Sequence, residues 1–335
     1  MNDARGVSPL VLAAVLSLVG AVAVVLGSAV GSTGWQAWGD VWTDPIAWQI
    51  VSDIRLPRSA GAWAGGALLG LSGAIAQGLF RNPLADPYLL GSASGASLGV
   101  SVALWVMGGG VISALWPVRF GLTAAAFAGA MLAVLLTLAL ARGVQHTVRL
   151  LLAGVIVGVV LGAITSLISL WQPEVMQAMQ AFLLGSTAFI GWSACGLMWC
   201  VLLLCLLISV LCARVLDALS LGQTTAQSLG LPLGPLRALL VAVLALATGT
   251  AVAQMGLIAF VGLAAPHAVR ALTRCTHRWS LPLSAGMGGG LLVLADVLAR
   301  GAMAPEELPV GVLTAVLGGS YLLGLMHRQS IRGGA

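Results

Sequence analysis

Lysine is absent from this 335-residue sequence, so all 15 of its Lys+Arg residues are arginine. A phosphate-binding loop of the GxxxxGK[ST] kind needs its lysine to reach the phosphates of a nucleotide. The chain therefore cannot hydrolyse ATP by that route. If it takes part in an ATP-driven process, a separate polypeptide must supply the ATPase.

Charged residues of either sign are also scarce. They make up 7% of the chain, whereas 59% of the residues are hydrophobic and the mean hydropathy is +1.05. Soluble domains do not have this composition, which indicates a protein that crosses a membrane many times. Since each crossing needs about 20 apolar residues, about ten transmembrane helices use nearly the whole length. The sequence thus predicts a single all-α transmembrane domain over residues 1–335, without a soluble domain.

Ten apolar segments can be read along the chain. They are Leu10–Val30, Ala60–Leu79, a segment beginning at Gly91, Gly121–Leu140, Leu150–Leu170, Gly196–Cys212, Arg237–Ala253, Gly256–Ala268, Leu281–Arg300 and a last one ending near Met326. Pro173–Trp192 is amphipathic and predicts a periplasmic or partly re-entrant helix. The second segment carries Gly61, Gly65, Gly66 and Gly70, and small residues at four-residue spacing predict close approach of a neighbouring helix.

The arginines divide unequally between the two sides of this topology. With the N-terminus inside, only Arg55, Arg58, Arg119 and Arg300 fall outside, and the other eleven lie on the cytoplasmic side. This agrees with the positive-inside rule. Both termini are therefore predicted to be cytoplasmic.

Motifs of enzymes and metal sites are missing as well. The sequence has no Ser/His/Asp cluster, no paired catalytic carboxylates and no HExxH motif. Its five cysteines form no CxxC pair, and we expect His146, His277 and His327, in cytoplasmic loops or at the tail, to have no neighbouring acid or cysteine with which to make a metal site. We expect no catalytic residue, no metal site and no cofactor, which leaves transport as the function.

One ionisable residue, Asp296, lies inside a predicted span, where such a residue is a functional candidate. It precedes Arg300 by four residues, so the two can instead form a structural ion pair on one helix face near the outer surface. Secondary transporters usually place several ionisable residues near the membrane midplane. A single candidate near an edge favours an ATP-powered permease subunit, with a secondary transporter as the alternative.

A polar segment, Asp217–Leu236, interrupts the apolar runs on the predicted cytoplasmic side. Ser220 is predicted to cap a short helix in which Ala226 and Leu229 share one face. Gly230 can end this helix in a left-handed conformation, and two prolines follow it. The pattern predicts a short rigid helix with small residues on its surface; the alternative is a plain connector without a partner.

Five stretches of the sequence resemble one family of transporters. They are RLPR (55–58), QGLFRNPLADPYLLGSASGA (77–96), LSLGQTTAQSLGLPL (219–233), FVGLAAPH (260–267) followed by Arg270, and LADVLAR (294–300) followed by ELPVGVLTA (307–315). Together they resemble the FecCD/BtuC-type permeases of ABC importers over nearly the whole chain.

The resemblance implies a type II ABC importer permease in the bacterial inner membrane. It also implies a homodimer, two cytoplasmic ATPase subunits and a periplasmic or surface substrate-binding protein as partners. The expected substrate is an iron chelate, either a ferric siderophore or haem, and the alternative is cobalamin.

The resemblance further implies roles for particular residues. Contact with the ATPase is expected from Leu221, Gly222, Ala226, Leu229 and Gly230. Docking of the binding protein is expected from Arg55, Arg58 and Arg300, which would face the periplasm. A cytoplasmic gate is expected from Gln145, His146, Thr147 and Val148. Because Val148 stands where a hydroxyl residue is expected, such a gate would close more by apolar contact.

Overall fold

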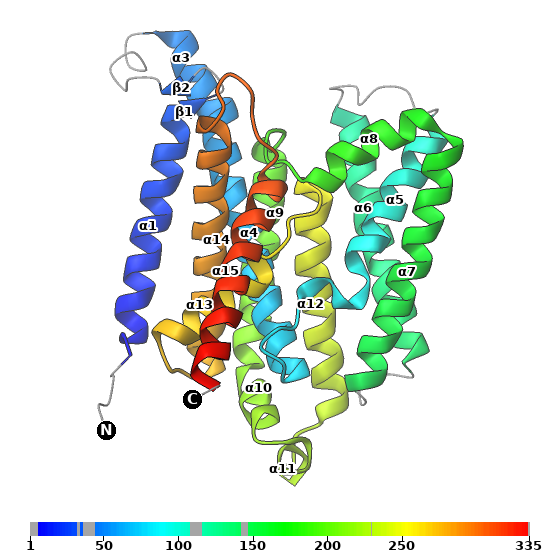
Figure 1. Cartoon of the computed structure of the whole chain (residues 1–335), viewed down its shortest axis with the longest axis vertical. Helices are drawn as coiled ribbons and strands as arrows, with labels where there is room; N and C mark the ends of the chain where they lie inside the picture. Colours follow the sequence, from blue (N-terminus) through cyan, green and yellow to red (C-terminus); the bar gives the residue numbers. More distant parts are fainter. Residues whose placement is uncertain are drawn as a thin grey trace.

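The computed structural model describes residues 6–31, 34–35, 44–107, 116–141, 147–228 and 230–333, which form a bundle of helices (Figure 1). In chain order the elements are α1 (Pro9–Ala29), β1 (Val30–Gly31), β2 (Gly34–Trp35), α3 (Pro45–Ile50), a π-helical turn η1 (Val51–Arg55), α4 (Leu56–Phe80), a 3-10 turn η2 (Pro87–Leu90), α5 (Ser92–Val106), α6 (Trp116–Leu140), α7 (Thr147–Trp171), α8 (Pro173–Leu184), α9 (Trp192–Leu211), α10 (Ala213–Ser220), α11 (Gln223–Ser228), α12 (Leu233–Met255), α13 (Val261–Leu272), α14 (His277–Gly301) and α15 (Val310–Gly333). The two short strands pair antiparallel, with Val30 opposite Trp35.

Each of the ten predicted spans overlaps a helix, so the all-α membrane architecture is confirmed, although the eighth span, Gly256–Ala268, becomes helical only at Val261. Seven of these helices are long and apolar enough to cross a membrane: α1, α4 together with the turns before it, α6, α7, α9, α12 and α14. The other three predicted spans are α5, α13 and α15, of which α13 has only 12 residues. Such a helix covers about 18 Å, which is less than the hydrocarbon thickness of about 30 Å. The predicted amphipathic helix is α8.

Helix α4 occupies the centre of the bundle, and nearly all of its residues are buried. It packs against α14 and α13 on one side and against α12 and α9 on the other. Helix α12 also contacts α5 and α6, and thereby joins α4 to the group formed by α5, α6, α7 and α8 (Figure 1).

The glycines of α4 explain its close contact with α14 and α13. A Cβ atom added at Gly66 would collide with the carbonyl oxygen of Gly288, and one at Gly70 would collide with that of Ser284. One turn further, a Cβ at Gly73 would collide with the backbone of Gly262 in α13. The backbones touch directly, as the small-residue spacing predicts.

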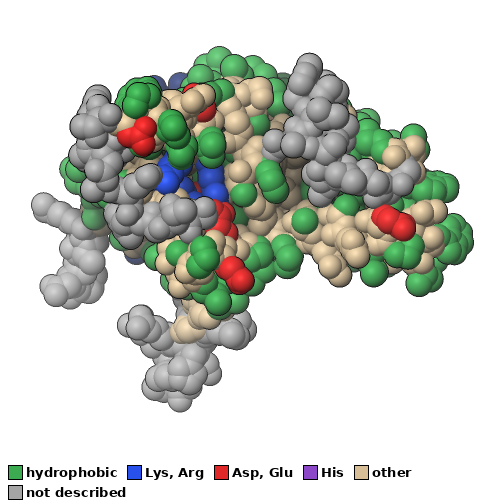
Figure 2. Space-filling view, turned by 90° about the horizontal axis from the view of Figure 1, so that it is seen from above, with side chains coloured by type: hydrophobic (Ala, Val, Ile, Leu, Met, Phe, Trp, Pro, Cys, Tyr) green, Lys and Arg blue, Asp and Glu red, His purple; other side chains and the backbone are tan. Residues whose placement is uncertain are grey.

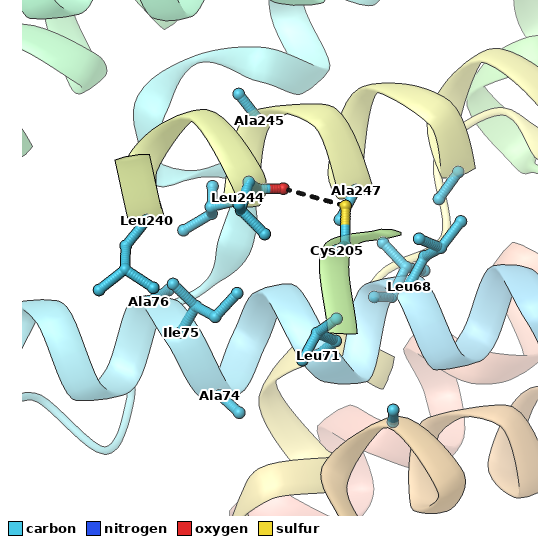
Figure 3. Packing of buried hydrophobic residues seen from close by; sticks show 14 of the residues in the cluster. Leu68, Leu71, Ala74, Ile75, Ala76, Cys205, Leu240, Leu244, Ala245 and Ala247 are labelled. Atoms are coloured by element: carbon cyan, nitrogen blue, oxygen red, sulfur yellow. Dashed lines mark hydrogen bonds between the residues drawn. The ribbon is translucent and has the colours of Figure 1, made fainter. Parts of the chain in front are cut away.

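The opposite face of α4 packs through larger side chains. Figure 3 shows Ile75 of α4 near Leu244 of α12, and Leu71 of α4 near Cys205 of α9, which lies between the two helices. The Cys205 thiol donates a weak hydrogen bond to the carbonyl oxygen of Val243, with 3.8 Å between sulfur and oxygen. These contacts belong to the largest buried apolar cluster of the described chain.

The bundle has two distinct ends, which are named here by their most characteristic residues. The hairpin β1–β2, α3 and the start of α4 lie at the arginine end, which contains Arg55, Arg58 and Arg300 (Figure 1). Helices α10 and α11 lie at the other end, called the polar-segment end. Helix α1 begins and helix α15 ends at the polar-segment end (Figure 1).

Candidate functional site

Helix α10 connects the bundle to the polar segment. Its residues Leu216 and Leu219 are buried, and the helix packs against α4 and α14. Ser220 is its last residue, and the Ser220 hydroxyl donates to the carbonyl oxygen of Asp217 at 2.6 Å. The predicted N-cap at Ser220 is therefore wrong, because α10 continues to this residue and uses its side chain in its own last turn.

Helix α11 begins one turn later, after Gly222, whose φ of +115° allows the sharp reversal of the chain. Leu221 is 69% exposed, whereas Ala226 is fully buried in the cluster that contains Leu216. The prediction that Ala226 lies on the outer surface of this helix is wrong. A helix of only six residues has no long apolar period, so the sequence did not distinguish its inner face from its outer face.

Two other residues of the predicted ATPase contact are Gly230 and Leu229. Gly230 is exposed and has φ +73°, which agrees with its predicted left-handed conformation. Leu229 lies outside the described residues. The outward surface here thus consists of Leu221, in the link before α11, and of the polar side chains of α11, which are Gln223, Thr224, Thr225, Gln227 and Ser228.

An acid and a histidine link the polar segment to α14. Asp217 Oδ1 lies 2.7 Å from His277 Nδ1 and also accepts the backbone amide of His277 at 3.0 Å. The expectation that His277 has no acidic neighbour is wrong, because the fold brings together residues 60 positions apart. This link ties α10 to the first residue of α14.

A buried cluster of charges lies at the arginine end. Arg58 Nη2 is 3.1 Å from Asp296 Oδ1 and 2.8 Å from Glu307 Oε2. Arg300 Nη2 is 2.7 Å from Asp296 Oδ2, which forms an ion pair without the alignment of a hydrogen bond. The predicted pair between Asp296 and Arg300 is therefore present, and it is shared with Arg58. Seen from this end, blue and red side chains gather between the apolar helices (Figure 2).

The backbone and nearby hydroxyl groups complete this cluster. Arg300 Nη1 donates to the carbonyl oxygens of Gly27 at 2.8 Å and Val30 at 2.9 Å, which close the end of α1. Arg300 Nη2 lies 3.2 Å from Ser59 Oγ, and the Thr187 hydroxyl donates to Asp296. Asp296 is wholly buried and Arg300 is 1% exposed. The Asp296 carboxylate thus joins α4, α14 and the link between α8 and α9, and Arg300 extends the cluster to the end of α1.

This geometry corrects one part of the docking prediction. Arg55, Arg58 and Arg300 do lie together at one end, but all three are buried in the isolated chain rather than facing the aqueous phase. Their guanidinium groups face internal acceptors because the ends of α1 and α14 and the loop carrying Glu307 close over them. Within the described ranges, Arg55 is the least strongly held of the three, with one hydrogen bond of 3.4 Å from Nη1 to the carbonyl oxygen of Ala29. Pairing with a partner's carboxylate stays a prediction, and for Arg58 it requires Glu307 to move away.

The residues predicted as a gate precede α7. Gln145 and His146 lie outside the described residues, and Thr147 is the first residue of α7. Val148 follows in the same turn and is 78% exposed. The apolar side chain of Val148 is thus exposed in the first turn of α7.

Comparison with known proteins identifies the kind of chain that carries these features. The model of the FecCD transport family matches residues 11–328. The chain belongs to the FecCD family. Its membership makes it the transport permease component of an ABC importer, a class that works with ATPase and substrate-binding partners.

Several FecCD relatives cover most of the chain. It is 38% identical over 297 residues to the uncharacterised ABC transporter permease YvrB of Bacillus subtilis, covering 87% of this chain and 82% of that protein. It is 37% identical over 314 residues to the vitamin B12 import permease BtuC of Escherichia coli, covering 93% of each. The iron(3+)-hydroxamate import permease FhuB of Bacillus subtilis is 36% identical over 300 residues, which cover 89% of this chain and 76% of FhuB.

Two solved structures share the fold. One is described as a metal-chelate type ABC transporter in an inward-facing conformation, with a TM-score of 0.85, 28% identity and coverage of 96% of this chain and 100% of that chain. The other is PsaBC from Streptococcus pneumoniae in complex with Fab, with a TM-score of 0.58, 18% identity and coverage of 85% and 92%. The type II ABC importer architecture expected from the sequence is confirmed.

The sequence missed three members of these sites. Glu307 and Thr187 join the cluster around Asp296, and Asp217 joins His277. A weak signal for Glu307 was present, because this residue opens one of the motifs that resemble the FecCD family. Nothing in the sequence indicated Thr187.

Proposed function

We propose that this permease imports an iron chelate, either a ferric siderophore or haem, across the bacterial inner membrane. The observation that supports this best is the similarity to a metal-chelate type ABC transporter over almost the entire chain. The similarity to FhuB, an iron(3+)-hydroxamate permease, points to the same substrate class. Cobalamin is the second candidate, because the similarity to BtuC is equally extensive.

The proposal includes a homodimer with two ATPase subunits below the polar-segment end, which faces the cytoplasm. The shape and exposure of α11 support this position. The helix lies beyond the rest of the bundle (Figure 1). Leu221, just before the helix, and the polar side chains of the helix are exposed, whereas Ala226 is buried against the bundle. The ATPase contact is assigned to Leu221, Gly222, Leu229 and Gly230, with Ala226 as a supporting residue.

The same proposal assigns the other two groups of residues. A substrate-binding protein docks at the arginine end, where one of its carboxylates competes with Glu307 for Arg58 and another reaches Arg55. Arg300 keeps its internal partners and positions the surface. Gln145, His146, Thr147 and Val148 form a gate between the two protomers, and the exposure of Val148 supports an apolar contact there.

Transport measurements on the reconstituted complex test the function. Proteoliposomes containing the permease and its ATPase, with the binding protein on the opposite side, should take up a ferric hydroxamate or haem only when ATP is present. Uptake of cobalamin in preference to both would overturn the proposed substrate. Uptake driven by a proton or sodium gradient without ATP would overturn the whole mechanism.

A matched pair of variants tests the contact on α11. Leu221→Arg places a charge in the proposed interface and should abolish ATP-driven uptake while the permease remains folded, since burying an unpaired charge costs about 3–5 kcal/mol. Leu84→Arg is the control, because Leu84 is 62% exposed in the loop after α4. Normal uptake by the Leu221→Arg protein, or equal loss in both variants, would contradict the assigned contact.

A further inference from the structure

A cavity of about 300 Å³ lies at the polar-segment end, away from α11. It is lined by Val269, Arg270, Thr273, Arg274, Cys275 and Ser280. These residues come from the last turn of α13, the link that follows it and the first turn of α14. A volume of this size is at the lower end of ligand pockets, which hold about 300–1,000 Å³, so it suits a head group rather than a large chelate.

The polar lining of this cavity has no internal counter-charge. Within the described part of the chain, the side chains of Arg270 and Arg274 make no ion pair or hydrogen bond. Thr273 is 4% exposed, and its hydroxyl has no hydrogen-bond partner among those same residues. Asp217, whose charge acts on the neighbouring Cys275 thiol, is engaged by His277. Two cations and the Thr273 hydroxyl group thus line a small cavity whose lining contains no acidic residue.

The start of α14 strengthens the preference for an anion. Helix α14 has 25 residues, and the side chain of its N-cap residue, Thr276, makes no capping hydrogen bond, although the Asp217 carboxylate accepts the amide of His277. The dipole of this long helix favours a negative group at this end. Phosphate fits such a combination of arginines, a hydroxyl group and a helix N-terminus.

The surroundings of the cavity are those of a membrane surface. Leu272 is 43% exposed and Trp279 is 37% exposed, one on each side of the link. Helix α1 is fastened beside them, because the amide of Val7 donates to the carbonyl oxygen of Leu272 at 3.0 Å. The outer face of α1 then continues as exposed apolar residues, beginning with Leu10 at 65%. Exposed tryptophan next to arginine is typical of the level of lipid head groups.

We propose that this cavity binds the phosphate of an anionic phospholipid, with Arg270, Arg274 and Thr273 around the phosphate and the acyl chains along α1. The bound lipid would join α1, α13 and α14 at the end where α14 is also linked to the polar segment. The site is independent of the substrate that the permease carries. Basic pockets between membrane helices bind anionic head groups by the same physics.

Binding of short-chain lipids to the delipidated full-length protein in detergent tests this proposal. Phosphatidylglycerol should bind more tightly than phosphatidylcholine with the same chains, and inorganic phosphate alone should bind far more weakly. Arg270→Gln and Arg274→Gln should each weaken phosphatidylglycerol binding about fivefold. Arg278→Gln is the matched control, because it removes the same charge from an exposed position one turn further and outside the cavity lining.

A second measurement uses the unaltered protein, so it does not depend on the folding of any variant. Cys275 lines the cavity, whereas Cys200 is exposed on α9. Phosphatidylglycerol should slow alkylation of Cys275 and leave Cys200 unchanged, as read by peptide mass mapping. Equal loss of binding in Arg274→Gln and Arg278→Gln, equal affinity for both lipids, or no protection of Cys275 would overturn the lipid site. Binding of inorganic phosphate as tight as that of phosphatidylglycerol would show a site for soluble phosphate instead.

Discussion

Replacing Asp296 by asparagine removes the one carboxylate that Arg58 and Arg300 share. The substitution preserves size, and asparagine Oδ1 can still accept the Thr187 hydroxyl. Removing one partner of a buried ion pair usually costs about 3–5 kcal/mol, because the remaining charge is left buried. Here Arg300 keeps two carbonyl oxygens and Arg58 keeps Glu307. We therefore expect a loss of unfolding free energy of about 3 kcal/mol, at the lower end of that range.

Glu307→Gln is the control for this experiment. It removes the other carboxylate from Arg58, but the Glu307 side chain is 26% exposed and its charge is partly screened by solvent. Such a pair contributes about 0–1 kcal/mol. Equilibrium unfolding in mixed detergent micelles, followed by tryptophan fluorescence, measures both variants against the parent protein.

The relative stabilities of the two variants can refute the role given to Asp296. If Asp296→Asn unfolds at the same denaturant concentration as Glu307→Gln, the buried carboxylate does not hold the arginine end together. A double variant, Asp296→Asn with Arg300→Gln, should lose less than the sum of the two single changes, because both remove the same contact. Strict additivity would mean that the two side chains do not stabilise each other.

Two further predictions concern packing and titration. Gly73→Ala should destabilise the fold by about 1–3 kcal/mol or more, since the added Cβ would meet the backbone of Gly262. Gly290→Ala is the control: a Cβ there meets nothing within 4 Å, so the stability should be equal or higher. The thermal unfolding temperatures of the two variants measure the difference. Burial, followed by the negative charge of Asp217, raises the pKa of the Cys275 thiol. Asp217→Asn should lower that pKa, increase the thiolate fraction around pH 8 and speed alkylation of Cys275, whereas an unchanged rate would mean that the carboxylate does not act on the thiol.

The sequence predicted features that depend on local spacing. The ten helices followed from apolar runs, the close approach of α4 and α14 from glycine spacing, and the pair of Asp296 with Arg300 from the four residues between them. Each of these is a property of one helix and the period of its side chains. The left-handed Gly230 followed from the preference of glycine for that conformation.

Features that depend on how distant segments meet were not predictable in this way. Arg58 and Asp296 are 238 residues apart, and nothing in either neighbourhood indicates the other. The arginines were expected to face the periplasm because of their side of the predicted topology and their places in the family motifs, but a shared buried carboxylate and the carbonyl oxygens at the end of α1 compensate for their burial. The burial of Ala226 was not predictable for a similar reason, since the pattern of a six-residue helix does not show which of its faces packs against the bundle.

The glycine contacts between α4 and α14 have a mechanical consequence. Side chains can change rotamer and let two helices slide, but two backbones in direct contact have no such freedom, so sliding would drive carbonyl oxygens into Cα atoms. Helices α4 and α14 must therefore move as one rigid body. Because α14 has 25 residues and extends about 37 Å, that body reaches from the Asp217–His277 link to the charge cluster around Asp296. We therefore expect a displacement of the polar segment to move the charge cluster around Asp296 with it, and we expect a pathway to open where helices meet through side chains, as α12 does with α5 and α6.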